Sequence, residues 1–125
     1  MHELSVAQEI ARTVLRIASE KGAKGITRIE VEVGKLTFLG IDQLRFWLEA
    51  CLEGTIGAGS KLVFREIDPV VRCRTCGYEG GIKEVEVDPA LHLMLPSLEC
   101  PTCGSTDVEI VSGRDCLIRR VELSI

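Results

Sequence analysis

The chain has 125 residues, of which 46% are hydrophobic, and this fits one compact domain or one domain with a small lobe. Its formal net charge of −4, from 15 basic and 19 acidic side chains, argues against nucleic acid as a partner, because phosphate contacts dominate that affinity. It has no apolar run of the roughly 18 residues that span a membrane and no signal-peptide pattern at its start, so we expect a cytoplasmic protein without a membrane partner.

The first element expected along the chain is a helix. Over residues 3–21, apolar side chains recur at steps of three and four, as in an amphipathic helix, and Gly22 supplies a stop signal. From residues 26–33 the apolar period changes to two, which predicts a half-buried strand.

A loop and a second helix follow that strand. The loop covers residues 34–40, and the helix is expected at about residues 41–52. Asp42 suits either its N-cap or its first turn, where a carboxylate is favourable. A second strand is predicted at residues 61–67, with its apolar side chains on one face.

Beyond Pro69 the composition changes. Cysteines, glycines and prolines interrupt residues 70–113, and strand character returns in residues 117–125, with Val121, Leu123 and Ile125 on one face. We predict an α/β fold in which two helices pack on a small three-stranded sheet. Residues 1–69 and 114–125 form this domain, and a small lobe at residues 70–113 is inserted into it.

The inserted lobe contains a paired cysteine motif. Its two knuckles are Cys73-Arg74-Thr75-Cys76-Gly77 and Cys100-Pro101-Thr102-Cys103-Gly104. Two residues between cysteines let both thiolates of a turn face one ion, and the following glycine permits positive φ. Four thiolates form a closed tetrahedral shell suited to structural Zn²⁺. We therefore predict a zinc-ribbon-like lobe with four cysteine ligands.

Other interpretations of the cysteines stay open. Two disulfides are disfavoured in a reducing cytosol, whereas an iron site cannot be separated from zinc by four thiolates alone. The remaining two cysteines, Cys51 and Cys116, are interpreted as core thiols.

The N-terminus offers nitrogen donors for a second metal. The Met1 α-amine, the His2 amide and the His2 imidazole can close fused chelate rings around one ion. Tetragonal nitrogen sets suit Ni²⁺ or Cu²⁺, and a fourth position is left for another ligand or for transfer. His2 can equally be an incidental residue after the start codon.

Several features together resemble the HypA family, the nickel-insertion proteins of [NiFe]-hydrogenase maturation. They are Met1-His2-Glu3, the first helix, the strand running into Gly34, the two knuckles and the tail at residues 117–122. The resemblance covers essentially the whole chain. It implies an α/β nickel-binding domain with an inserted zinc domain, nickel at Met1, His2 and Glu3, and zinc at the knuckles.

The resemblance also implies a role and partners. The protein is expected to carry nickel as cargo, to be no enzyme, and to work with a nickel-handling maturation GTPase (HypB-like). The [NiFe]-hydrogenase large subunit is the expected destination. We expect the GTPase to dock beside the first helix and the N-terminus.

Two further nickel ligands are suggested by the resemblance. Asp42 corresponds to an aspartate that assists nickel binding in relatives only if the preceding loop holds extra residues, and Lys35 and Thr37 depart from the family's usual Gly-Glu-Leu-Ser. The loop between the knuckles resembles the extended archaeal form, in which a histidine can complete the nickel shell. His92 is the candidate, or else an incidental loop residue.

Two other functions compete with nickel transport. Paired knuckles are also common in zinc-ribbon modules that bind protein or nucleic acid, and the acidic balance counts against the latter. A hydrolase would need an open metal site or a nucleophile with a base, and the sequence offers neither.

Overall fold

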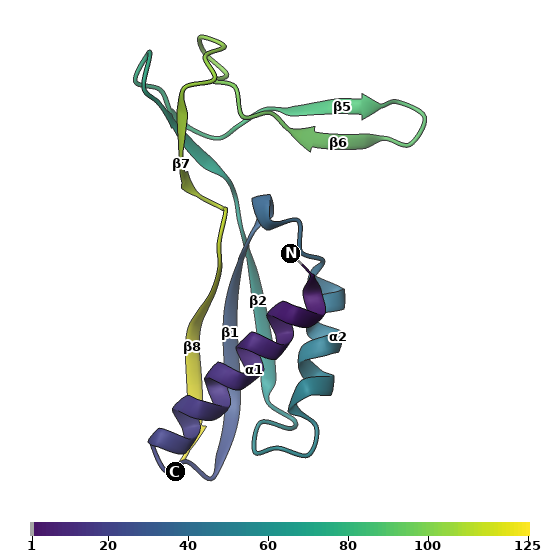
Figure 1. Ribbon diagram of the computed structural model, residues 1–125, viewed down its shortest axis with the longest axis vertical. Helices are drawn as coiled ribbons and strands as arrows, with labels where there is room; N and C mark the ends of the chain where they lie inside the picture. The colour runs from purple at the N-terminus through teal and green to yellow at the C-terminus, as the bar shows by residue number, and fades with distance from the viewer. Residues whose placement is uncertain (1) are drawn as a thin grey trace.

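The computed structural model describes residues 2–125, which form two lobes along the long axis of the molecule (Figure 1). In the larger lobe, α1 (Glu3–Glu20) and α2 (Ile41–Leu52) cover one face of a sheet with the strand order β2-β1-β8. These strands are β1 (Gly25–Gly34), β2 (Lys61–Ile67) and β8 (Cys116–Ser124). The predicted α/β fold with two helices on three strands is confirmed. No helix among residues 2–125 is long and apolar enough to cross a membrane.

Helix α1 follows the apolar spacing seen in the sequence. Its buried side chains recur at steps of three and four residues, namely Ala7, Ile10, Ala11, Val14 and Ala18. Gly22 has a φ of 65° just beyond the C-cap, so the predicted glycine stop is confirmed.

The sheet has one apolar and one charged face. The central strand β1 runs parallel to β2 and antiparallel to β8, and Ile29 pairs with Leu62 on one side and Val121 on the other. Ile29 is fully buried under the helices. On the opposite face Arg28 lies 2.8 Å from Glu30 and 3.3 Å from Glu122. One face therefore holds the core and the other faces water.

The structure decides between the two positions expected for Asp42 and corrects the one expected for Ile125. Gly40, not Asp42, is the N-cap of α2, and Asp42 lies in the first turn. β8 ends at Ser124, which pairs with the first residue of β1, so Ile125 has no strand beside it and is 77% exposed.

The smaller lobe contains five short strands that hydrophobic periodicity did not predict. A three-stranded sheet has the order β4-β3-β7, and β5 pairs with β6 in a separate hairpin. The strands are β3 (Val70–Cys73), β4 (Glu79–Gly80), β5 (Glu84–Asp88), β6 (Leu93–Pro96) and β7 (Val108–Ser112). Figure 1 shows the hairpin projecting sideways from this lobe.

The two lobes meet where three backbone segments cross. Gly34 at the end of β1 donates to the Asp115 carbonyl at 2.8 Å, and Leu36 in the 3₁₀ turn η1 (Lys35–Thr37) donates to the Gly113 carbonyl at 2.8 Å. Gly113 has a φ of 90° and packs against Pro69. Only glycine allows both this φ and this approach.

Candidate metal sites

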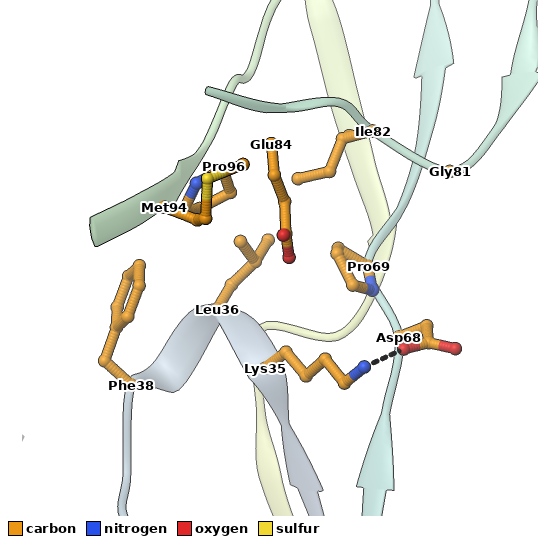
Figure 2. A pocket seen from close by; sticks show the side chains of 10 residues that line it. All are labelled: Lys35, Leu36, Phe38, Asp68, Pro69, Gly81, Ile82, Glu84, Met94 and Pro96. Carbon is orange, nitrogen blue, oxygen red and sulfur yellow. Dashed lines mark ion pairs between the residues drawn. The ribbon is translucent and has the colours of Figure 1, made fainter. Parts of the chain in front are cut away.

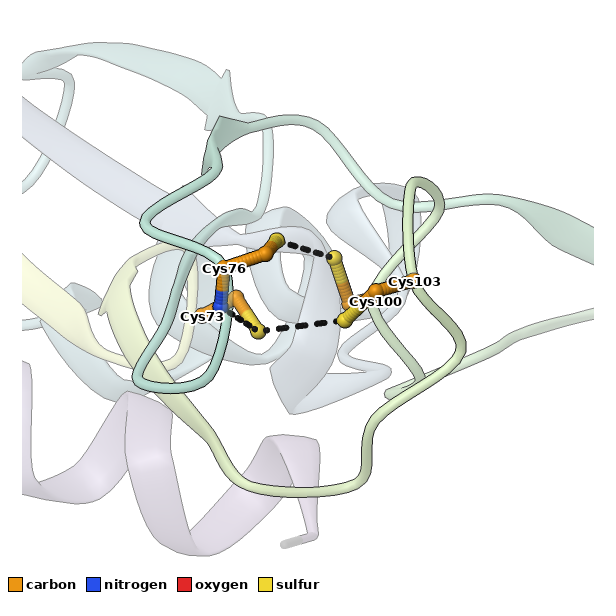
Figure 3. A group of neighbouring side chains, drawn as sticks. All are labelled: Cys73, Cys76, Cys100 and Cys103. Atoms are coloured by element: carbon orange, nitrogen blue, oxygen red, sulfur yellow. Dashed lines mark hydrogen bonds between the residues drawn. The ribbon is translucent and has the colours of Figure 1, made fainter.

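The four knuckle cysteines converge although two pairs lie far apart in the sequence. Cys73 ends β3, Cys100 precedes β7, and the sulfurs of all four lie within 4.8 Å of one another. Figure 3 shows the two knuckle loops facing each other with the thiols between them. The pairing of β3 with β7 brings the loops together.

The spacing of the sulfurs suits a tetrahedral ion. Cys73 Sγ lies 3.6 Å from Cys103 Sγ, and Cys76 Sγ lies 3.6 Å from Cys100 Sγ. A zinc–sulfur distance of about 2.3 Å requires tetrahedral edges of about 3.8 Å. A disulfide requires about 2.05 Å. The arrangement is therefore that of a metal shell.

Backbone N–H groups face the thiols, and the glycine after each knuckle has the positive φ that the sequence predicted. Gly77 and Gly104 have φ values of 80° and 75°. The Cys76 N–H donates to Cys73 Sγ at 3.4 Å, and the Thr102 N–H donates to Cys100 Sγ at 3.4 Å. The Cys76 N–H, helped by that of Thr75, lowers the pKa of the Cys73 thiol to about 6. This favours the Cys73 thiolate that binds metal, whereas burial and hydrogen bonds to the neighbouring thiols raise the pKa of Cys76.

Polar contacts between the knuckles were missed by sequence reasoning. Arg74 Nη1 lies 3.0 Å from Asp107 Oδ1, and the hydroxyls of Thr75 and Ser105 lie 3.0 Å apart. The sequence gives no local signal for them because their partners are about thirty residues apart. They align the two loops that carry the cysteines.

The N-terminal donors lie at the start of α1. His2 is exposed and is the N-cap of the helix, where its Nδ1 accepts a hydrogen bond from the Leu4 N–H at 3.2 Å. Met1, the other predicted nickel ligand of this pair, lies outside the described residues.

Glu3 connects this end of the chain to α2. Its Oε2 accepts a hydrogen bond from the Gly40 N–H at 3.1 Å, and this bond lowers the pKa of the Glu3 carboxyl. Because Gly40 is the N-cap of α2, the contact also brings the first turn of α2, with Asp42, to the side of α1 where His2 lies.

His92 lies elsewhere. It has a φ of 50° and belongs to the turn between β5 and β6, at the end of the hairpin that points away from the N-terminus in Figure 1. The structure therefore holds Glu3 at the N-cap of α2, two residues before Asp42, whereas His92 lies in the β5–β6 turn of the other lobe. Cys51 and Cys116 are half-buried and pack against the core of the larger lobe.

Comparison with known proteins defines the class. A family model described as "Hydrogenase/urease nickel incorporation, metallochaperone, hypA" matches residues 1–123. The chain belongs to this HypA family of nickel metallochaperones, and its four-cysteine cluster suits a structural zinc ion. The match favours the nickel carrier over the zinc-ribbon binding module.

Relatives named "Hydrogenase maturation factor HypA" span nearly the whole chain. The chain is 35% identical to that of Methanothermobacter thermautotrophicus, over 98% of this chain and 97% of the relative. It is 36% identical to that of Methanopyrus kandleri, over 100% of this chain and 94% of the relative.

Among solved structures, the fold resembles the solution structure of the nickel metallochaperone HypA from Helicobacter pylori. The TM-score is 0.68 at 18% identity, with 99% of this chain and 98% of that chain covered. A second solution structure of a HypA protein gives a TM-score of 0.62 at 19% identity, over 98% of this chain and 96% of that chain. At such identity these likenesses support the fold alone.

Proposed function

We propose that Met1 and His2 bind Ni(II) as cargo, that Cys73, Cys76, Cys100 and Cys103 hold a structural zinc, and that the nickel is delivered for [NiFe]-hydrogenase maturation. The observation that carries the proposal is the exposed His2 at the start of α1, within a family of nickel metallochaperones. Nickel is transferred here rather than used, so the protein acts as a carrier and not as an enzyme. A cytoplasmic site of action fits this role.

Glu3 and Asp42 are proposed to support the nickel site. The Glu3–Gly40 hydrogen bond holds the N-terminus against the start of α2 and leaves the Asp42 carboxylate free to approach a bound ion. His92 is proposed as a ligand that a movement of the β5–β6 hairpin would supply, because its turn belongs to the smaller lobe.

The two proposed metal sites lie in different lobes. Residues 1–69 and 114–125 are proposed to carry nickel, and residues 70–113 to hold zinc. A nickel-handling maturation GTPase (HypB-like) and the [NiFe]-hydrogenase large subunit are the proposed partners, since the family name places the chain in hydrogenase nickel incorporation.

Equilibrium nickel binding to untagged protein tests the site. His2→Ala should abolish tight binding and leave zinc and the fold beyond the first turn of α1 intact, because His2 is exposed at the start of that helix. A Gly-Ser extension before Met1 should do nearly the same, because it removes the free α-amine from the chelate. Affinity should rise with pH, since the ion must displace protons from its nitrogen donors.

Asp42→Ala and His92→Ala should have smaller effects and show which side chain completes the shell. If the extended protein binds nickel as tightly as the native chain, the terminal chelate is wrong.

A further inference from the structure

A cleft lies between the two lobes, below the β5–β6 hairpin, as Figure 2 shows. Its volume is about 360 Å³, and it opens to solvent. Apolar side chains form most of its walls, namely Leu36 and Phe38 from the larger lobe and Ile82, Met94 and Pro96 from the smaller one.

Phe38 is the most unusual residue of the cleft. Its side chain is 66% exposed, and its backbone has a φ of 57° at the end of η1. A bulky residue at positive φ is uncommon, and exposing it to water gains no burial energy. Such strained, exposed residues occur at ligand-binding sites, where a partner covers them.

The hairpin turns a defined face toward the cleft. Side chains alternate along a strand, and Glu84 pairs with Pro96 while Glu86 pairs with Met94. Glu84, Met94 and Pro96 line the cleft, so Val85 and its partner Leu95 occupy the outer face. Met94 is 45% exposed although it faces Phe38 across the opening.

The cleft carries a net negative charge, because Lys35 is the one cation among its lining residues and Asp68 and Glu84 are both carboxylates. Lys35 Nζ lies 2.6 Å from Asp68 Oδ1, which pairs the cation with that carboxylate. Glu84 points into the cleft in Figure 2 and has no ion-pair partner within 4.0 Å among residues 2–125. A cationic side chain with an apolar stem would satisfy it.

The cleft is also connected to the N-terminus. Phe38 lies in the loop that ends at Gly40, whose N–H binds Glu3 next to His2. A protein held at Phe38 would therefore approach the proposed nickel ligands from the side of α2.

We propose that this inter-lobe cleft docks an apolar segment of a protein partner, and that a lysine or arginine of the segment pairs with Glu84. The partner is the protein that exchanges nickel with this chain, so the inference rests on the proposed function. The docking surface is the cleft and not the outer face of the hairpin.

Affinity measurements on matched variants test the surface. The probes are the purified maturation GTPase and the purified hydrogenase large subunit, titrated separately. Phe38→Asn keeps a residue that tolerates positive φ, and it should weaken binding to one probe at least tenfold. Phe46→Asn removes a phenylalanine of similar exposure, 62%, from the surface of α2 and should change nothing. Circular dichroism and zinc content verify that both variants fold.

Two further pairs of variants test which side chains of the cleft contact the docked segment. Met94→Ser should weaken binding, whereas Val85→Ser on the outer face should not. Glu84→Arg should weaken binding at least tenfold, and an acidic residue placed at the partner's lysine or arginine should restore it. Benzoylphenylalanine at position 38, but not at position 46, should cross-link to that apolar segment.

Several results would overturn the inference. One is that Phe46→Asn weakens binding as much as Phe38→Asn, and another is that Val85→Ser weakens it while Met94→Ser does not. Cross-linking from position 38 to a second copy of this chain would also overturn it, as would wild-type protein that binds neither probe. Nickel binding is measured separately on the same wild-type protein. A chain that binds nickel but whose cleft variants bind the probes normally would reject the cleft and keep the proposed function.

Discussion

At the scale of single residues, His2 has two tasks that conflict. Its Nδ1 caps α1 by accepting from the Leu4 N–H at 3.2 Å, and the same nitrogen is the one that closes a chelate ring with the His2 amide. Nickel binding through that ring therefore removes the cap from the helix. The two tasks can be separated because asparagine is a good N-cap and lacks imidazole.

We expect His2→Asn to lose tight nickel binding and to keep the start of α1, whereas His2→Ala loses both. The loss of the cap should lower the free energy of unfolding by about 0.5–2 kcal/mol. Urea denaturation measures this, and hydrogen exchange at the Leu4 amide should speed up when native protein binds nickel. Unchanged exchange on nickel binding would show that Nδ1 remains on the helix.

Glu3 makes stability depend on pH. The Gly40 N–H lowers the pKa of the Glu3 carboxyl from its usual 4.5, so the ionised form stabilises the folded state. This contribution is fully present above the unfolded pKa and is lost as pH falls through the folded one. Glu3→Gln should therefore be less stable than wild type at neutral pH, and the difference should decrease as pH falls below 4.5 and vanish below the folded pKa. Urea denaturation at several pH values measures it, with Glu9→Gln on exposed α1 surface as control.

At the scale of elements, the crossing of Gly34, Gly113 and Pro69 sets how β1, β3 and β8 meet. A Cβ at Gly113 would lie 2.6 Å from the Pro69 Cα, and the φ of 90° disfavours any other residue. We expect Gly113→Ala to cost at least the roughly 1–3 kcal/mol typical of a strained backbone. Gly81→Ala is the matched control, because no atom lies within 4 Å of its Cβ. Denaturant unfolding measures both variants, and an equal loss of unfolding free energy in the two would contradict this role of the crossing.

At the scale of the whole molecule, the two lobes are stabilised by different means. The larger lobe buries a continuous core that includes Ile29, Leu44 and Leu48, each 0% exposed. Among residues 70–112, all of which the structure describes, the only fully buried apolar or thiol side chains are those of Val71, Cys73 and Cys100. So small a core cannot order the lobe alone, and structural zinc sites contribute roughly 10–16 kcal/mol of apparent binding in small peptides.

We therefore expect zinc removal, or Cys103→Ser, to disorder residues 70–113 and to leave α1, α2 and the β2-β1-β8 sheet folded. Hydrogen exchange measured by mass spectrometry should show the loss of protection confined to the smaller lobe. Cys51→Ser, which lies outside the cluster, should retain zinc. Cooperative loss of both lobes would show that zinc holds the whole molecule.

Local patterns in the sequence determined much of this protein. Periodicity predicted α2 and β2 with the bounds that the structure has, because the spacing of apolar residues records which face is buried. The knuckle spacing predicted the four-cysteine cluster, since ligand geometry is set within each turn. The sequence also showed the nitrogen donors of Met1 and His2, and nickel binding by these donors stays a prediction.

Only the tertiary structure decided how distant segments meet. The Glu3–Gly40 bond, the Gly34–Gly113 contact and the Lys35–Asp68 ion pair join residues more than thirty positions apart, and no local pattern encodes them. The hairpin strands β5 and β6 also escaped prediction. Residues 84–88 do alternate between acidic side chains and valine, a strand signal that our prediction for this segment did not use. Residues 93–96 are apolar throughout and largely exposed, so β6 has no such alternation. The cleft between Phe38 and Met94 exists because folding brings these two exposed segments together.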